Sequence, residues 1–199
     1  MPMNFSAVIL AGGKSSRMGR DKAWLEVDGE ALLSRQVKLV RQWGAGEIFI
    51  SGRPETNYSA FGCPVLSDKF ADAGPLAGIE RALAAATSSL LLVLAVDLPA
   101  LKLQFLQWLI ADCRANLGTI PRLNGRLEPL VAVYPKAAHF LAESSLAAGQ
   151  NAVGMFATHC VESGLAQFKE IPAAEAACLT NWNYLADLAT GLPGVQTPD

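Results

Sequence analysis

Residues 5–22 read FSAVILAGGKSSRMGRDK, an apolar run followed at once by a glycine-rich, basic loop. The apolar part, Phe5–Ala11, is almost continuously hydrophobic, as expected for a β-strand covered by helices on both faces. The glycines Gly12 and Gly13 let the backbone approach a ligand and turn its N–H groups toward an anion. Such a loop after a buried strand predicts an α/β fold with an anion site at the carboxyl end of its first strand.

Strand-like and helix-like patterns alternate along the rest of the chain. Further strands are predicted at Glu47–Ser51, Pro64–Ser67, Leu90–Val96, Leu130–Val133 and Phe168–Ile171. Helices are predicted at Ala31–Trp43, Pro75–Ala86, Leu101–Asn116, Pro135–Ala148, from an Asn151 cap through Phe156, and at Trp182–Thr190. This alternation is typical of βαβ units. We therefore predict one Rossmann-like α/β domain over residues 1–190, with a mainly parallel central sheet and helices on both faces, and a frayed tail over residues 191–199.

Composition excludes several classes of protein. Half of the 199 residues are hydrophobic and 17% are charged, which excludes a mostly disordered chain. The formal net charge of -2 argues against a nucleic-acid binder. The longest apolar run, Leu90–Val96, is too short to span a bilayer, and the first residues lack the basic and long apolar parts of a secretion signal. We expect no membrane partner and a cytoplasmic location.

The four cysteines lie far apart, and the chain has two histidines, His139 and His159. No Cys or His pair has the spacing of metal ligands, so we expect reduced thiols, with neither a zinc site nor a histidine-based catalytic triad.

The charges of the glycine-rich loop suit a polyphosphate. The loop carries Lys14, Arg17, Arg20 and Lys22. Against these four cations stands only Asp21, and a local positive excess of this kind favours phosphate binding. A P-loop is excluded because Val8 stands where that motif needs glycine, and the G-x-G-x-x-G spacing of dinucleotide-binding loops is absent. The alternative is an ordinary exposed loop with solvated charges.

A carboxylate, Asp97, follows the buried strand Leu90–Val96 directly. Burying a carboxylate is costly unless it meets a cation or hydrogen-bond donors. A divalent ion that bridges phosphate oxygens would satisfy it, and Mg²⁺ commonly binds through one or two carboxylates together with phosphates. Alternatively, Asp97 caps a helix that starts near Pro99.

The string LAGGKSSRMGRDK, residues 10–22, resembles the opening motif of the molybdenum cofactor guanylyltransferases, LAGG-x-S-x-RMG-x-DK. The resemblance implies that Leu10, Ala11 and Gly12 lie against guanine and that Gly13 and Arg17 lie nearer the phosphates. It also implies that Lys22 binds the phosphates and stabilises the charge that develops on them. Asp97, in a D-x-P setting like that of the family, would bind Mg²⁺.

Three further stretches resemble parts of the same family. The D-x(5)-GPLAG segment implies that Asp68 contacts the nucleotide and that Gly74 and Gly78 shape the cleft. The G-R-x-x-PL stretch makes Arg126 a contact for the pterin substrate, and an N-x-N pattern places Asn181 and Asn183 on the same side. From the residues alone, Asp68 reads as a loop acid, Arg126 as part of a turn, and Asn181 or Asn183 as a helix cap.

The resemblance implies that GMP is transferred from GTP to molybdopterin, with or without molybdenum, and that pyrophosphate is released. Molybdoenzyme maturation proteins would be further partners. Ser51 departs from the asparagine that some relatives carry, so guanine selection through that side chain stays open. The alternatives are a cytidylyltransferase for the same pterin, a sugar-phosphate nucleotidyltransferase, or a non-catalytic GTP-binding maturation partner. LAGG with Asp21-Lys22 favours guanine, and Lys22 with Asp97 favours catalysis.

Overall fold

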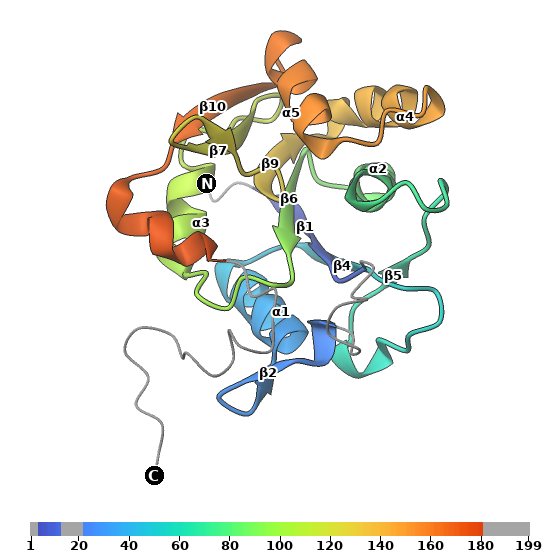
Figure 1. The fold of residues 1–199 in the computed structure, drawn as a ribbon, viewed down its shortest axis with the longest axis vertical. Coiled ribbons are helices and arrows are strands. Elements are labelled where there is room, and N and C mark those ends of the chain that lie inside the picture. The colour runs from blue at the N-terminus through green and yellow to red at the C-terminus, as the bar shows by residue number, and fades with distance from the viewer. Residues whose placement is uncertain (1–3, 13–21, 181–199) are drawn as a thin grey trace.

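The computed structural model describes residues 4–12 and 22–180, which form a central β-sheet flanked by helices (Figure 1). The strands of this sheet are β1 (Phe5–Leu10), β4 (Glu47–Ser51), β5 (Val65–Leu66), β6 (Leu90–Ala95), β7 (Gly118–Leu123), β8 (Arg126–Leu127), β9 (Val131–Pro135) and β10 (Ala166–Glu170). They lie in the order β10-β7-β9-β6-β1-β4-β5, and β8 pairs with β7. A separate hairpin joins β2 (Glu26–Val27) and β3 (Glu30–Ala31).

The sheet is mainly parallel, as the sequence predicts. Strand β1 pairs in parallel with β4 and β6, β4 with β5, and β7 with β10. Strand β9 runs antiparallel to both β6 and β7. Because β9 runs antiparallel to both of these neighbours, β6 and β7 run in the same direction. The carboxyl ends of β5, β4, β1, β6, β7 and β10 therefore share one edge of the sheet.

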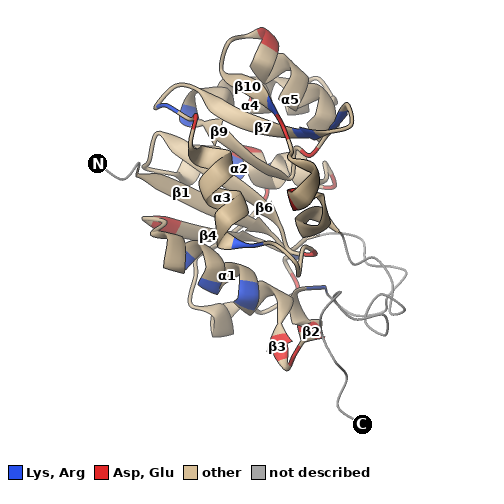
Figure 2. Ribbon diagram, turned by 90° about the vertical axis from the view of Figure 1, so that its left-hand side faces the viewer, with Lys and Arg blue, Asp and Glu red and all other residues tan. Residues whose placement is uncertain are grey.

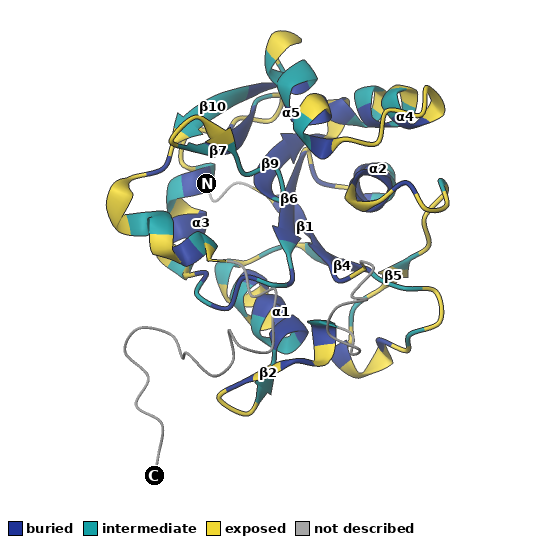
Figure 3. Cartoon of the chain, in the orientation of Figure 1, coloured by how far each residue is buried: buried dark blue, intermediate teal, exposed yellow. Residues whose placement is uncertain are grey.

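Helices cover both faces of the sheet. They are α1 (Leu32–Trp43), α2 (Pro75–Ala85), α3 (Leu103–Ile110), α4 (His139–Ala147) and α5 (Val153–Glu162), with short 3₁₀ turns η1 (Lys22–Trp24), η2 (Ser59–Phe61), η3 (Lys136–Ala138) and η4 (Ala173–Leu179). Because successive side chains of a strand point to opposite faces, Ala7 and Ile9 of β1 pack toward α1 and α3, while Val8 and Leu10 pack toward α2. Figure 3 shows the central strands buried. The predicted α/β fold is confirmed.

Four strands were absent from the prediction: the short β2, β3 and β8, and the longer β7. The predicted helix Leu101–Asn116 is shorter, because α3 ends at Ile110 and a turn closed by bonds between Arg114 and Leu117 leads into β7. Strand β7 contains Gly118 and Pro121, two residues that are depleted in strands, which hid it from sequence patterns. Gly118 is needed there, since a Cβ would lie 2.1 Å from the Val133 carbonyl oxygen.

The second half differs from the prediction mainly at element ends. Strand β9 runs on to Pro135, so the helix begins at His139 rather than at Pro135. The cap of α5 is Ala152 and not Asn151, without a side-chain capping bond. The predicted helix Trp182–Thr190 and the tail lie outside the described residues. Within residues 4–12 and 22–180, no helix combines the length and apolar character needed to cross a bilayer.

Candidate active site

The glycine-rich segment leaves the sheet between two neighbouring strands. Leu10, the last residue of β1, is paired with Ser51 of β4 on one side and with Ala95 of β6 on the other. The sheet edge places the start of the predicted loop beside the segment that leads to Asp97. In open α/β sheets, ligands bind outside the carboxyl ends of the strands.

Backbone hydrogen bonds fix the first residues of this loop. The Ala11 and Gly12 N–H groups both donate to the Ser51 carbonyl oxygen, at 2.8 and 3.0 Å. On the other side, the Val96 N–H donates to the Leu10 carbonyl oxygen at 3.2 Å. From the sequence, Ser51 bears on the site only through its side chain and guanine selection. In the structure, its carbonyl oxygen also holds the start of the loop.

Lys22 and Asp97 form an ion pair at this edge. The Lys22 Nζ atom lies 2.7 Å from the Asp97 Oδ2 atom, and the two side chains are 20% and 17% exposed. The structure thus brings together a cation from the end of the loop and a carboxylate 75 residues further along the chain. Gly13 and Arg17, the other two phosphate contacts that the resemblance implies, lie outside the described residues.

Helix α1 holds the segment that carries Lys22. Ala23 of η1 is fully buried, and the Leu32 N–H at the start of α1 donates to the Leu25 carbonyl oxygen at 2.7 Å. Lys38 of α1 lies 2.6 Å from Glu30 of β3. Figure 2 shows the basic residues of α1 beside the acidic β2–β3 hairpin. These contacts anchor the chain directly after Lys22.

Asp97 does not cap a helix. The next helix, α3, begins at Leu103, and its cap, Lys102, makes no side-chain capping bond. In the described part of the chain, no three His, Cys, Asp or Glu side chains gather to hold a metal ion. Mg²⁺ commonly binds through one or two carboxylates together with phosphate and water oxygens, so the Asp97 carboxylate has the chemistry to hold this ion beside a bound triphosphate.

Asp68 belongs to the same edge through β5. It lies two residues after Leu66, the end of that strand, and is exposed. Partial burial of its carboxyl group raises the pKa of Asp68, and the nearby Glu80 carboxylate adds to this rise. Both causes disfavour the charged form of Asp68, so its carboxyl group takes up a proton at a higher pH than an ordinary aspartate does.

The two glycines of the GPLAG segment have distinct structural tasks. Gly74 has φ of 73°, a left-handed conformation that favours glycine, and Pro75 then begins α2. Gly78 lies inside α2, where a Cβ would stand 2.2 Å from the Ser51 Oγ atom and 3.1 Å from the Leu10 Cδ2 atom. Gly78 therefore lets α2 pack directly against the ends of β4 and β1.

Arg126 begins β8, on the hairpin at the carboxyl end of β7. It is exposed, with its guanidinium 3.8 Å from Glu128. The same stretch returns to the site edge at Leu130, whose carbonyl oxygen accepts a 2.8 Å bond from the Ala95 N–H. Asn181 and Asn183 lie outside the described residues.

Two residues of α1, Arg35 and Gln36, belong to no motif that the sequence shows. Their side chains donate hydrogen bonds to the loop that follows Asp97.

Comparisons with known proteins agree with this architecture. The family model of the MobA-like NTP transferase domain matches residues 7–162. A probable molybdenum cofactor guanylyltransferase of Opitutus terrae is 39% identical over 193 residues, covering 94% of this chain and 96% of its own. A protein of the same name from Pelotomaculum thermopropionicum is 38% identical over 143 residues, covering 72% and 69%.

Among solved structures, a nucleotidyl transferase from Methanothermobacter is similar in fold. Its TM-score is 0.76 at 20% identity, over 94% of this chain and 95% of that one. The family model covers most of the chain and includes the Leu10–Gly12 loop, Lys22 and Asp97. The chain therefore belongs to the MobA-like nucleotidyltransferases, the family of the molybdenum cofactor guanylyltransferases.

Proposed function

We propose that this enzyme transfers GMP from GTP to the terminal phosphate of molybdopterin, with or without bound molybdenum, and releases pyrophosphate. The observation that carries the proposal is the Lys22–Asp97 pair, at 2.7 Å, beside the Leu10–Gly12 backbone at the carboxyl edge of the sheet. The names of the relatives from Opitutus terrae and Pelotomaculum thermopropionicum support the choice of substrates.

The GTP side of the site comprises the glycine-rich loop and two acids. We assign Leu10, Ala11 and Gly12 to the guanine base, and Gly13 with Arg17 to the phosphates. Asp68, two residues beyond the end of β5, would contact the nucleotide from the neighbouring strand. Lys22 would bind the triphosphate. When GTP enters, Lys22 would leave its ion pair with Asp97 and pair with phosphate oxygens instead.

The proposed reaction is a direct displacement at phosphorus. An oxygen of the acceptor phosphate forms a bond to the α-phosphorus of GTP, and the bond from that phosphorus to the β-bridging oxygen breaks. Pyrophosphate leaves with the bonding electrons, and no protein nucleophile is required. Lys22 and Arg17 would align the triphosphate for attack. Their positive charges would also offset the negative charge that develops around the five-coordinate phosphorus. Asp97 would hold Mg²⁺, which when bound neutralises charge on the triphosphate.

The acceptor would enter from the side of the sheet that β7, β8 and β9 build. The G-R-x-x-PL stretch supports this, because Leu130 is bonded to Ala95, two residues before Asp97. Arg126, Asn181 and Asn183 would contact the pterin, while Gly74 and Gly78 shape the cleft wall. We also propose a cytoplasmic location and delivery of the product to molybdoenzyme maturation proteins.

Pyrophosphate release tests the reaction directly. Purified enzyme with molybdopterin and Mg²⁺ is supplied with GTP, CTP or UTP in turn, and GTP should give the fastest release. Faster release with CTP would replace the guanylyl assignment by a cytidylyl one. Binding of GTP without any release would favour the non-catalytic maturation partner.

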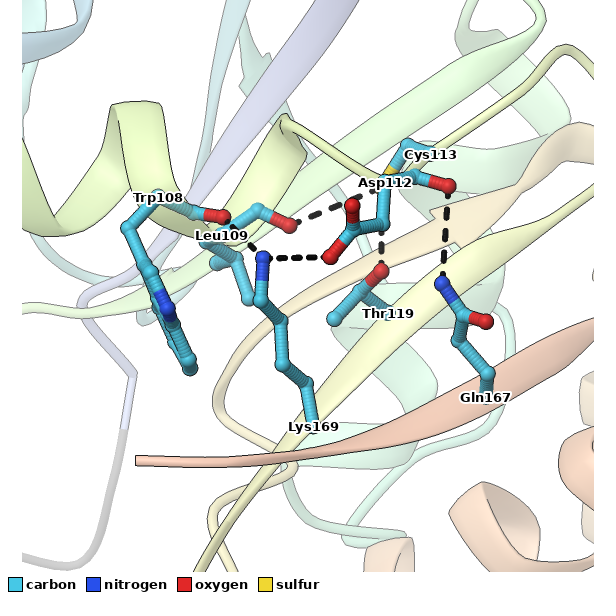
Figure 4. Close-up of polar contacts among 7 residues, drawn as sticks. All are labelled: Trp108, Leu109, Asp112, Cys113, Thr119, Gln167 and Lys169. Carbon is cyan, nitrogen blue, oxygen red and sulfur yellow. Dashed lines mark hydrogen bonds and ion pairs between the residues drawn. The ribbon is translucent and has the colours of Figure 1, made fainter. Parts of the chain in front are cut away.

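The variant Asp97→Asn tests the role of the carboxylate. We expect a loss of about a hundred- to thousandfold in kcat, the scale for removing one group that stabilises transition-state charge. A matched control is Asp112→Asn. Asp112 also pairs with a lysine, because Lys169 lies 2.6 Å from its Oδ2 atom, but the pair sits between α3 and β10 (Figure 4). The control should keep full activity; equal activity of both variants would remove Asp97 from the site.

A further inference from the structure

Two adjacent residues of α1 contact the loop that follows Asp97. The Gln36 Nε2 atom donates to the Leu98 carbonyl oxygen at 2.8 Å, and the Arg35 Nε atom donates to the Pro99 carbonyl oxygen at 3.2 Å. We infer that Gln36, supported by Arg35, is a positioning residue that fixes Asp97 relative to Lys22. This inference rests on the proposed function, in which that pair takes part in nucleotidyl transfer.

The hydrogen bond that Gln36 makes is buried and does not lie on the protein surface. Gln36 is only 1% exposed, although it lies on an otherwise amphipathic helix among apolar neighbours. Burying an amide costs free energy unless its polar atoms are bonded, and the Gln36 Oε1 atom has no hydrogen-bond partner among residues 4–12 and 22–180. A leucine or methionine would fill the same space without that cost, so the packing of the core does not explain a glutamine at this position.

The bonds of the loop hold Asp97 from both sides. Before it, the Val96 N–H is bonded to the Leu10 carbonyl oxygen at the start of the glycine-rich loop. After it, the Leu98 carbonyl oxygen accepts bonds from Gln36 and from the Leu101 N–H. The residue that carries the carboxylate is thereby fixed between β1 and α1.

Helix α1 also anchors the other member of the pair. Its first residue, Leu32, donates to Leu25, three residues after Lys22, and buried Ala23 lies between them in sequence. One rigid helix thus sets the position of Lys22 through η1 and of Asp97 through Gln36. Small errors in the placement of catalytic groups lower turnover strongly, so a shared support of this kind bears on kcat rather than on substrate affinity.

The test removes the two donors while keeping their volume. Gln36→Met keeps the length of the side chain but cannot donate to Leu98, and Arg35→Met cannot donate to Pro99. We expect kcat to fall about two- to tenfold in Gln36→Met, the range that one net hydrogen bond supports, with KM for GTP changed less than about twofold. The Mg²⁺ concentration for half-maximal rate should rise. Arg35→Lys, which keeps a donor, should recover the activity that Arg35→Met loses.

Two control variants lie on the same helix. Arg41 also donates to backbone carbonyls, those of Phe61 and Gly62, but these belong to a different loop. Arg41→Met should leave kcat and the Mg²⁺ requirement unchanged. Val37→Ala deletes a buried side chain next to Gln36 and lowers overall stability without removing a bond to the loop. If Val37→Ala lowered kcat as much as Gln36→Met, general destabilisation would explain both and the inference would fall.

Hydrogen exchange gives a measurement that does not depend on activity. In the free protein, the amides of residues 96–98, 100 and 101 should exchange about two- to tenfold faster in Gln36→Met than in the wild type or in Arg41→Met. Unchanged exchange there would overturn the positioning role. If the wild type released no pyrophosphate from any nucleotide, the proposed function would fail, while the exchange rates would still decide whether Gln36 holds the loop.

Discussion

Gly78 and Ser51 meet at the point where α2 touches the site edge. A Cβ at position 78 would stand 2.2 Å from the Ser51 Oγ atom and 2.9 Å from the Ser51 Cβ atom. Both distances are too short for atoms that are not bonded, so either the helix or the strand end would have to move. Ser51 also holds the Ala11 and Gly12 N–H groups through its carbonyl oxygen. A change at Gly78 therefore reaches the glycine-rich loop through one residue.

We predict that Gly78→Ala destabilises the fold by about 1–3 kcal/mol, although alanine favours a helix over glycine by about 1 kcal/mol. Ser51→Gly in the same chain should recover most of this loss, because it removes both atoms that clash. Urea unfolding of the two single variants and the double variant measures the coupling. Gly154→Ala in α5 is the control, since no atom of the described residues lies within 4 Å of a Cβ there, and it should not destabilise. Additive effects of the two substitutions would contradict the close approach.

At the scale of elements, Glu47 links three central strands at the opposite edge of the sheet. Its Oε2 atom accepts bonds from the Ser6 hydroxyl of β1 at 2.6 Å and from the Thr87 N–H before β6 at 2.8 Å. The Ser6 bond is the largest cause that lowers the pKa of Glu47, and the Thr87 bond adds to it. The ionised carboxylate thus holds β4, β1 and β6 in register.

Glu47→Gln should lower the free energy of unfolding by about 1 kcal/mol at neutral pH, because bonds to a charged acceptor become bonds to a neutral one. The folded pKa lies below its ordinary value of 4.5, so the unfolded chain binds the proton more readily. The contribution is full above about pH 5 and is lost as the pH falls through the folded pKa. Urea midpoints of the wild type and the variant should therefore converge as the pH falls below the ordinary pKa of 4.5. A gap that stays constant would show that the charge of Glu47 plays no part.

The elements that the sequence predicted correctly are those whose burial leaves a local pattern. Strands β1 and β6 are covered on both faces and read as continuous apolar runs, so Asp97 stands out at the end of one of them. Strand β7 is not visible in the same way because its Gly118 serves a close approach to β9. Gln36 could not be predicted either. A polar residue on an amphipathic helix normally faces solvent, whereas Gln36 shares the buried face of α1 with Leu32 and Val40 and bonds the loop after Asp97.

At the scale of the whole molecule, the candidate site exists only in the folded chain. Leu10, Ser51, Asp68 and Asp97 come from four segments whose strand ends meet at one sheet edge. A nucleotide that needs all of them binds the native state and not the unfolded one. Its binding free energy therefore adds to the free energy of unfolding of the entire domain, and the base that binds best gives the largest gain.

GTP with Mg²⁺, at about a hundred times its Kd, should raise the free energy of unfolding by about 2.7 kcal/mol. For a chain of this size, that corresponds to a rise in Tm of about 5–10 °C, measured by circular dichroism. CTP at the same concentration should give a smaller rise, since the Leu10–Gly12 segment is assigned to guanine. Asp97→Asn should lose the part of the rise that depends on Mg²⁺, whereas Asp112→Asn, whose pair lies between α3 and β10, should keep it. Equal rises with GTP and CTP would contradict selection of guanine by this site and leave the base undecided between the two.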